Sequence, residues 1–471
     1  MSKFRDSLFQ RLFAIIAFIA CLSLFIELKG LFLKNGILPF AFLNSRFHGL
    51  EAFVKLPSLF TFASSDFFIY FVLVIAFISL IVLASHFIRN RFIRSALFLI
   101  FYICYLSFVN FGEPFMSFQW DALLLETCFL FILYFFLSQD STLSKINIWF
   151  FRILVFKLML MSGVVKIFSG DQAWLDLSAL EYHYFTQPLP NFISFFVHQL
   201  PSWFHKASCL LMFVIELVLP FFVFSGKRLR EFAAWVFILF QVIIFLTGNY
   251  GFFNLLAIVL CFSLFDFQAN QSKTFIFKKT FKYLSITLLV LYSLVSLSLI
   301  CSRIKTPVWT LKPAQVYYQS LGHFHICNPY GLFAVMTKKR GEIVIQGGKQ
   351  IPGELGLEWK EYKFKYKPQA LNSVPMQIAP LQPRLDWQMW FAALSEYKRN
   401  PWFVNLIKKL LVNEKDVVNM LKVNPFENSP PDVIRALYFN YEFNDLQDYL
   451  ETKETWKKTY EGVYLPEVSL N

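Results

Sequence analysis

The sequence predicts a polytopic α-helical membrane protein of about nine spans, followed by a C-terminal α+β domain outside the membrane. Hydrophobic residues make up 56% of the 471 residues, and the mean hydropathy is +0.51. These values are far above those of an ordinary soluble domain. Apolar runs of about 17–25 residues, the length that crosses a bilayer, recur up to Cys301, and the sequence after Cys301 is more polar.

Nine apolar runs have roughly the length of a membrane span. They are residues 12–33, 67–87, 92–111, 118–137, 149–168, 207–225, 232–247, 251–267 and 283–301. The first run continues past Leu24 without a small-residue cleavage site, which favours a retained span over a signal peptide. Only Gly248 to Gly251 separate the seventh and eighth runs, so that a tight hairpin or a broken helix is expected there.

The positive charges of the first 300 residues predict the orientation. They cluster in the N-terminus and in three loops, as Lys3, Arg5 and Arg11; Arg89, Arg91 and Arg94; Lys227, Arg228 and Arg230; and Lys273, Lys278, Lys279 and Lys282. With nine spans all four groups lie on one side, which the positive-inside rule makes cytoplasmic. The same pattern explains the net charge of +13 without a nucleic-acid partner.

The chain after Cys301 is expected to lie outside the cytoplasm, in a periplasm or a secretory lumen. We therefore divide the chain into a transmembrane domain, residues 1–301, and an extracytoplasmic domain, residues 302–471. Alternating apolar residues predict strands within 331–336, 342–345 and 359–366. From Trp387 onward the apolar residues follow a helical period. The domain is thus predicted to hold a small sheet followed by helices.

Two carboxylates interrupt the fourth span. A charged residue at the centre of a membrane helix costs roughly 2.5–3.5 kcal/mol, so Asp121 and Glu126 need partners. At about 1.5 Å of rise per residue, Lys157 in the fifth span lies at the depth of Glu126, and Lys166 lies at the depth of Asp121. We therefore expect two layers of acid and base. The complete set of predicted buried polar residues is Gln119, Asp121, Glu126, Lys157, Lys166, Glu216 and Gln241.

This cluster is open to two interpretations. Buried ion pairs between packed helices often fix their register without performing chemistry. Lys166, however, follows the small residues Ser162 and Gly163, and a desolvated lysine can act as a base. No catalytic residue is assigned, and Lys166, Asp121 and Glu126 are the candidates.

The long outer loop, residues 169–206, is the second candidate site, because long aromatic loops are commonly functional. The candidates for contact with a client protein, in this loop and near the Gly248 turn, are Trp174, Tyr182, His183, Gln187, Trp203, Asn249 and Asn254. The spacing of the histidines fits no metal signature, and no CxxC pair or phosphate-binding loop occurs. The sequence therefore predicts neither a metal nor a cofactor.

Five strings carry a resemblance to a known family. They are FMSFQWDALLLETCFL (115–130), LMLMSGVVKIFSGDQAWLDLSALEYHYFTQPLP (158–190), TGNYGFFNLLAIVL (247–260), NPYGLFAVMTKKRGEIVIQG (328–347) and PRLDWQMWFAAL (383–394). Together they resemble the lipase maturation factor family, over residues 112–443. The resemblance implies a membrane protein, of the endoplasmic reticulum in animals, that helps secreted lipases to fold. In length the chain is similar to the shorter, bacterial members of the family.

A weaker resemblance connects the membrane half to the vitamin K-dependent carboxylase group. Members of that group carry a lysine between a small-residue helix segment and a tryptophan, as Lys166 stands between Gly163 and Trp174. This resemblance implies that Lys166 is a base acting on a quinone-like or lipid substrate.

The sequence thus leaves three hypotheses. The leading one is a maturation factor whose outer loop and C-terminal domain engage an exported client protein. The second is a membrane enzyme that uses Lys166. The third is a transporter built on Glu126, Lys157 and Glu216, which ranks last because the chain lacks the repeated halves common in transporters.

Overall fold

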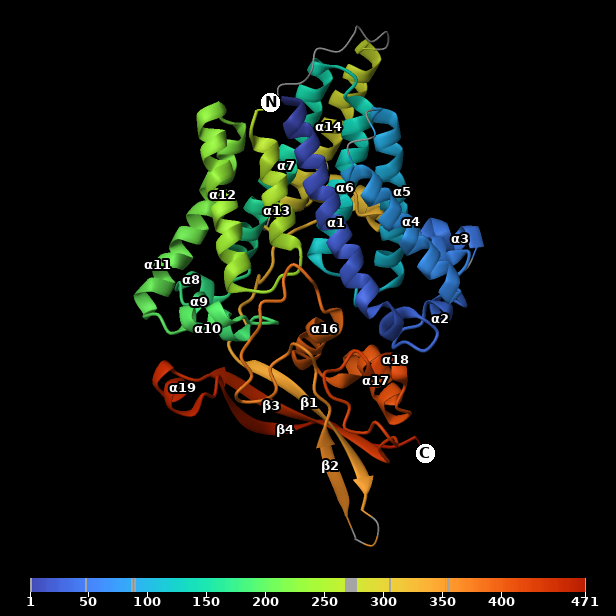
Figure 1. The fold of residues 1–471 in the computed structure, drawn as a ribbon. Helices are drawn as coiled ribbons and strands as arrows, with labels where there is room; N and C mark the ends of the chain where they lie inside the picture. The colour runs from blue at the N-terminus through green and yellow to red at the C-terminus, as the bar shows by residue number, and fades with distance from the viewer. Residues whose placement is uncertain are drawn as a thin grey trace.

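The computed structural model of this protein describes residues 2–46, 49–85, 88, 90–266, 278–304, 306–351, 353 and 356–470. A bundle of long helices holds the N-terminus at one end, and a smaller region built of strands and short helices lies beyond the other end (Figure 1). Arg89 and Lys273, which belong to the predicted cytoplasmic charge groups, lie outside the described residues.

Within the described ranges, eight helices are long and apolar enough to cross a membrane. They are α1 (Ser2–Phe32), α4 (Asp66–Ala84), α5 (Arg91–Phe111), α6 (Gln119–Leu137), α7 (Ser141–Phe168), α11 (Ser202–Phe213) continued by η2 (Val214–Val218) and η3 (Leu219–Phe224), α12 (Lys227–Thr247), and α14 (Lys278–Cys301). They correspond to eight of the nine predicted spans. The protein is therefore a polytopic helical membrane protein.

The remaining predicted span, residues 251–267, forms a shorter helix. It consists of the 9-residue α13 (Phe253–Cys261) and the 3-residue η4 (Phe262–Leu264). Twelve helical residues rise only about 18 Å, against a hydrocarbon core of about 30 Å. The segment nevertheless leads back to the end where α12 begins, because Arg230 of α12 donates to the Leu264 carbonyl at 2.8 Å and to Asp266 at 2.5 Å.

Short helices collect at the end of the bundle that faces the strands. The predicted outer loop folds into α8 (Gln172–Leu175), α9 (Ala179–Thr186) and α10 (Phe192–His198), which lie at this end near the sheet (Figure 1). Two further short helices, α2 (Phe40–Asn44) and α3 (Gly49–Lys55), follow α1.

After α14 the chain turns back against the bundle. The segment comprises η5 (Val308–Leu311), α15 (Lys312–Leu321) and η6 (Gly322–Phe324). Ser298 of α14 fixes it, donating from its hydroxyl to the Thr310 carbonyl at 2.7 Å and accepting from the Ala314 N–H at 3.1 Å. The chain directly after the predicted domain boundary is thus packed on a membrane helix.

The strand predicted within residues 331–336 does not form. Gly331 has φ +126° and Phe333 has φ +55°, which are not strand conformations. Gly331 instead exchanges two hydrogen bonds with the Gln119 side chain, at 3.0 and 3.3 Å. A Cβ at Gly331 would lie 2.4 Å from a methyl group of Val165, so the segment needs glycine to pass this close to α7. The alternation of apolar residues here reflects contact with helices, not pairing in a sheet.

The sheet has four antiparallel strands in the order β2-β1-β3-β4. The strands are β1 (Arg340–Gln350), β2 (Leu357–Glu361), β3 (Val433–Phe443) and β4 (Trp456–Val468). β1 contains the predicted strand region 342–345, and β2 overlaps the predicted region 359–366 at residues 359–361. β3 and β4 follow the helices in the chain and complete the sheet, so the C-terminal region is not simply a sheet followed by helices.

Helices α16 (Arg384–Ala393), η7 (Tyr397–Arg399), α17 (Pro401–Leu411) and α18 (Lys415–Val418) connect the two hairpins, and α19 (Leu446–Thr452) connects β3 to β4. α16 lies between the sheet and the bundle (Figure 1). Its Trp387 packs edge-on against Phe118 and Trp120 at the start of α6, with ring centroids 5.6 and 4.8 Å apart. Trp402 of α17 packs in the same way on Phe115 at 5.3 Å. A continuous apolar core therefore joins the bundle to the C-terminal region.

Candidate functional site

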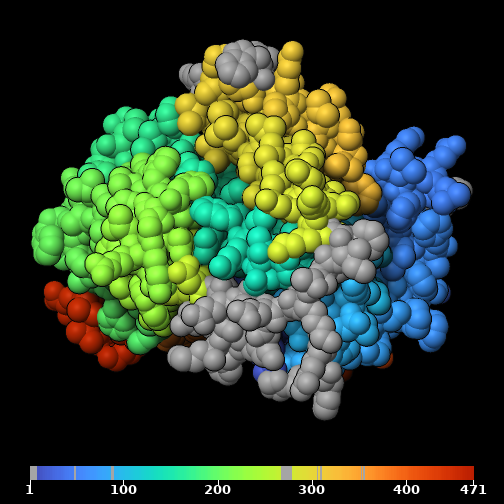
Figure 2. All heavy atoms as spheres, turned by 90° about the horizontal axis from the view of Figure 1, so that it is seen from above, coloured from blue at the N-terminus to red at the C-terminus, as the bar shows by residue number. Residues whose placement is uncertain are grey.

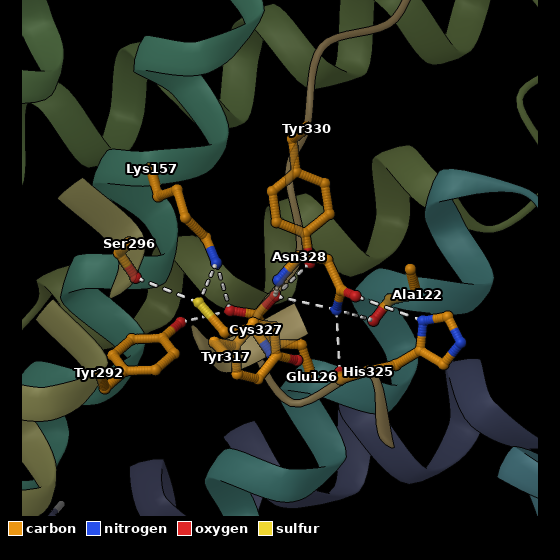
Figure 3. Close-up of polar contacts among 10 residues, drawn as sticks. All are labelled: Ala122, Glu126, Lys157, Tyr292, Ser296, Tyr317, His325, Cys327, Asn328 and Tyr330. Carbon is orange, nitrogen blue, oxygen red and sulfur yellow. Dashed lines mark hydrogen bonds and ion pairs between the residues drawn. The ribbon is translucent and has the colours of Figure 1, made fainter. Parts of the chain in front are cut away.

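Glu126, in the middle of α6, is the centre of the buried polar network. Its Oε1 accepts from the Lys157 ammonium of α7 and the Tyr292 hydroxyl of α14, both at 2.5 Å. Its Oε2 accepts from the Tyr330 hydroxyl at 2.6 Å and from the backbone and side-chain N–H groups of Asn328 at 2.8 and 3.2 Å. Figure 3 shows these donors converging on the carboxylate from two helices and a loop. The predicted pairing of Glu126 with Lys157 is confirmed.

The ion pair at the centre of the network is shielded from bulk solvent. The Glu126 and Lys157 side chains are both fully buried. Lys157 also contacts the Cys327 sulfur at 3.3 Å, which in turn lies 3.4 Å from the Ser296 hydroxyl (Figure 3). A buried ion pair stabilises a protein only when its remaining hydrogen-bonding capacity is satisfied. Four further donors bind the Glu126 carboxylate of this pair, and three of them come from Asn328 and Tyr330, more than 200 residues away in the chain.

Lys166, near the end of α7, does not pair with Asp121 as predicted. Its ammonium binds both carboxylate oxygens of Glu216, at 2.8 and 2.7 Å. Glu216 belongs to η2, which is a turn of π-helix within the α11 span. The Trp174 ring lies beside the pair, with its centroid 5.4 Å from the Lys166 nitrogen.

A glycine allows this pair to form. A Cβ at Gly163 would lie 2.6 Å from a methyl group of Leu217 and 3.0 Å from the Cβ of Glu216. No real Cβ tolerates the first distance, so a side chain at Gly163 would require Leu217 to move and would crowd the Cβ of Glu216. The small residue before Lys166 thus serves helix contact, as the sequence suggested, and brings Glu216 within reach of the lysine.

Asp121 finds its partner in the C-terminal region. Arg384, the second residue of the PRLDW string, binds it through two nitrogens at 2.9 and 2.8 Å. Tyr105 donates its hydroxyl to the same carboxylate at 2.5 Å. Arg384 also donates a side-chain N–H to the Phe115 carbonyl at 2.8 Å and its backbone N–H to Glu27 of α1 at 2.6 Å. Bidentate arginine–carboxylate pairs are among the strongest ionic contacts in proteins.

Gln241, predicted to join the acid and base layers, lies elsewhere. Its side-chain oxygen accepts from Asn254 at 2.8 Å, so these two residues join α12 to α13. Glu216 likewise contributes to the Lys166 pair and not to the Glu126 layer. The polar residues predicted to form one cluster therefore form separate contacts along the bundle.

At the end of the bundle that faces the strands, His183 of α9 begins a chain of hydrogen bonds. Its Nε2 lies 2.8 Å from the Tyr250 hydroxyl, which donates to the Gln187 side chain at 2.8 Å. Gln187 in turn donates to the Thr247 carbonyl at 2.9 Å. Burial, and secondly the positive charge of Lys166, lowers the pKa of His183 to about 4. His183 is therefore neutral at physiological pH and fixes the Gly248 turn against α9.

Arg340, at the start of β1, forms hydrogen bonds with the end of α9. Its guanidinium is fully buried and donates to the backbone carbonyls of Phe185, Gln187 and Pro188. Glu342 balances its charge at 2.7 Å. The sheet is thus bonded directly to the predicted outer loop.

Asn249 forms a second set of hydrogen bonds between the bundle and the C-terminal region. Its amide nitrogen donates to the carbonyls of Leu189 at 3.1 Å and Met376 at 2.8 Å. Its oxygen accepts from the N–H groups of Ile378 and Ala379 at 2.7 and 2.9 Å. Asn249 and Asn254 are buried and support the fold, in contrast to their expected position on a client-binding surface.

The aromatic candidates of the outer loop differ in exposure. Trp174 is buried and donates its indole N–H to the Phe333 carbonyl at 3.0 Å. Tyr182 is half-buried under Lys338, whose nitrogen lies 5.7 Å from the ring. Trp203, at the start of α11, is 70% exposed. Of these three, Trp203 is the side chain most available to a partner.

The residues at these sites that the sequence arguments missed include Arg384, Asn328, Tyr330 and Glu27, and also the hydroxyl donors Tyr105 and Tyr292. The strings NPYG and PRLDW carried a signal, since both belong to the family resemblance. They were assigned to a soluble domain, so no contact with the membrane acids was expected. Glu27, in an apolar run, satisfies the same criterion that singled out Asp121 and Glu126.

Two hollows in the described structure lie away from these ion pairs. One lies between α7 and α14, and the other lies between the end of α16 and strands β3 and β4. Within the described residues, no three His, Cys, Asp or Glu side chains are grouped as metal ligands would be.

The fold and the site define a class: an integral membrane protein whose buried acids bind a C-terminal domain to its helices. Comparison with known proteins gives the family. The chain matches the family model of the lipase maturation factor transmembrane domain over residues 4–272, and that of the lipase maturation factor C-terminal domain over residues 326–466. It therefore belongs to the lipase maturation factor family.

Two relatives illustrate the similarity. Lipase maturation factor 1 of Mus musculus is 35% identical over 404 residues, which cover 78% of this chain and 69% of the relative. Lipase maturation factor 2 of Xenopus tropicalis is 31% identical over an alignment of 581 residues. The alignment covers 97% of this chain and 81% of the relative. No solved structure matches the chain. The resemblance to the carboxylase group receives no support from these comparisons.

Proposed function

We propose that this protein is a membrane-bound maturation factor that helps exported proteins to fold, with lipases as the client class. Membership in the lipase maturation factor family supports the client class. The observation that carries the rest is the pairing of Asp121 with Arg384, reinforced by Glu126 with Asn328. These contacts join the C-terminal region to the end of the bundle that faces the strands.

The burial of these ion pairs suits a folding platform better than an enzyme. A catalytic base must be reachable by its substrate, whereas the Lys166 ammonium is bound to both oxygens of Glu216 and is almost completely buried. The tightly packed surroundings of Glu126 argue in the same direction. The buried pairs therefore act as structural connections in this proposal.

The proposal includes a topology. The N-terminus is cytoplasmic, and the region beyond Cys301 faces a periplasm or the lumen of the endoplasmic reticulum. In support, the N-terminus and the strands lie at opposite ends of the bundle (Figure 1). We keep the division into residues 1–301 and 302–471 as transmembrane and extracytoplasmic domains, with the chain just after Cys301 folded back onto α14.

Trp203 is the proposed client contact of the outer loop. It is exposed at the start of α11, on the side of the bundle where the sheet lies. The test is secretion of an active lipase from cells that lack their own maturation factor and express this chain or a variant. We expect Trp203→Ser to lower the specific activity of the secreted lipase while the amount of membrane protein stays unchanged.

Trp235→Ser is the matched control, because Trp235 is a 63% exposed tryptophan on the neighbouring helix α12. It should leave lipase activity at the parental level. If the full chain does not raise secreted lipase activity at all, the proposed function is wrong. If both tryptophan variants reduce activity equally, Trp203 acts as a membrane anchor and not as a client contact.

A further inference from the structure

An apolar groove runs along the outside of the bundle between α7 and α14. Its volume is about 280 Å³. The lining residues are Trp149 and Ile153 of α7, and Leu289, Val290, Ser293, Leu294 and Leu297 of α14. Ser293 is the one hydroxyl among them, and it donates to the Leu289 carbonyl of its own helix at 2.6 Å. The groove therefore offers carbon surface to a ligand.

Both walls of the groove lead to an exposed lysine at the same end. On α7, Lys145 lies four residues before Trp149 and eight before Ile153, which puts all three on one face of the helix. On α14, Lys282 lies seven and fifteen residues before Leu289 and Leu297, again on one face. Lys145 and Lys282 are both exposed.

The two helices start together and run in the same direction. Lys278 at the start of α14 binds Asp140, the N-cap of α7, at 3.0 Å, so the Asp140 carboxylate already has a cation of its own. Figure 2 looks onto this end of the molecule, where α14 in yellow lies beside the teal segment that includes α7. By the charge distribution of the loops, this is the cytoplasmic end.

The spacing fits one leaflet of a bilayer. Helix rise puts Leu289 about 10 Å and Leu297 about 22 Å below Lys282. A leaflet has about 15 Å of hydrocarbon and about 5–7 Å of headgroup region, together about 20–22 Å. Lysine side chains near a helix end extend toward the headgroups. A ligand held at Lys145 and Lys282 would therefore have its phosphate at the interface and its acyl chain in the groove.

We propose that the α7–α14 groove is a binding site for an anionic phospholipid of the cytoplasmic leaflet. Lys145 and Lys282 bind the phosphate and the negatively charged headgroup. Trp149 and the apolar face of α14 hold one acyl chain. The site is independent of the proposed client-binding face, since it lies on the opposite half of the bundle.

The test uses the full chain reconstituted in vesicles of equal parts phosphatidylcholine and phosphatidylglycerol. Native mass spectrometry of the protein released into mild detergent counts the lipids that remain bound. We expect selective retention of phosphatidylglycerol by the parent. The double variant Lys145→Gln/Lys282→Gln should retain it on the order of tenfold less, because each basic residue near an anionic headgroup contributes several-fold. Lys227→Gln, an exposed lysine at the same end but on α12, is the matched control.

A second variant tests the acyl-chain contact. Ser293→Phe fills the groove and should displace the lipid, whereas Leu291→Phe, at an exposed site outside the groove lining, should not. Retention without preference for phosphatidylglycerol, or equal retention by the lysine variant and its control, would overturn the proposal.

A third measurement follows the bound lipid through the fluorescence of Trp149 in the groove lining. Phosphatidylglycerol with brominated acyl chains should quench the fluorescence of Trp149 more strongly than brominated phosphatidylcholine does. The Trp149 signal is the difference between the parent and Trp149→Phe. The exposed Trp235 of α12, measured through Trp235→Phe, should be quenched equally by both lipids. Equal quenching of Trp149 by the two lipids would also overturn the proposal.

Discussion

The pair of Asp121 and Arg384 allows a quantitative test of how the bundle and the C-terminal region are joined. Both side chains are fully buried and share two hydrogen bonds. Removing one partner of a buried pair leaves an uncompensated charge, which costs about 3–5 kcal/mol. Asp121→Asn and Arg384→Met should therefore each destabilise the protein by that amount.

The double variant separates the pair from its surroundings. Replacing both charges removes the uncompensated ion, so the double variant should be less destabilised than the sum of the two single variants by about 3 kcal/mol or more. The assay is unfolding of the purified protein in nanodiscs, monitored by proteolysis of the chain after Cys301. Single variants should release that region for cleavage at lower denaturant concentration than the parent.

The surface pair of Asp448 and Lys457 is the matched control for this cycle. Its charged atoms lie 2.8 Å apart, but the side chains are 45% and 52% exposed. Solvent screens such pairs, so Asp448→Asn with Lys457→Met should show no measurable coupling. Strict additivity at Asp121 and Arg384 would refute the argument that this buried pair joins the C-terminal region to the bundle.

Three further predictions concern other contacts. Gly163→Ala should destabilise the protein by about 1–3 kcal/mol in thermal unfolding, because its Cβ would overlap Leu217; Gly226→Ala, where a Cβ meets open space, is the control. Tyr330→Phe should cost about 1–2 kcal/mol, since it removes one of five donors to Glu126; an unchanged midpoint would contradict that role. Burial lowers the pKa values of His183 and His198 to about 4, below the usual value near 6.5. Between about pH 4 and 6.5 the unfolded state thus binds more protons than the folded state. The free energy of unfolding should therefore fall as pH decreases from about 6.5 to 4. His183→Gln should flatten this dependence, and an equally steep curve would count against it.

Helix rise was sufficient to predict the pair of Glu126 and Lys157. α6 and α7 are consecutive and antiparallel, so counting residues from the turn between them gives the relative depth of their side chains. The same counting failed for Lys166. Ser202 begins α11 about 21 Å from Glu216 along the helix, although Lys166 lies only two residues before the end of α7. α11 therefore starts well beyond the end of α7, and the assumption of a common membrane depth was wrong.

The sequence could not predict the partner of Asp121 for a different reason. Arg384 is separated from it by 263 residues and lies in a segment whose polarity predicts a soluble domain. Periodicity places a residue on a face of its own helix, but it does not say which distant segment covers that face. The prediction for segment 331–336 failed in the opposite way. The alternation of apolar residues there predicts a strand, but Gly331 and its close contact with α7 determine the conformation of the segment.

The distance along the chain between Asp121 and Arg384 bears on how the protein is made. Translation proceeds at about 5–20 residues per second, so the arginine leaves the ribosome roughly 15–50 s after the aspartate. During that interval, Tyr105 has already been synthesised, and its hydroxyl can donate to Asp121 as it does in the folded protein. Until Arg384 is synthesised, the Asp121 carboxylate lacks its main partner, and its place in the first turn of α6 allows water to solvate it. Truncated nascent chains that end before Arg384 should then be recognised and degraded as incompletely assembled membrane proteins.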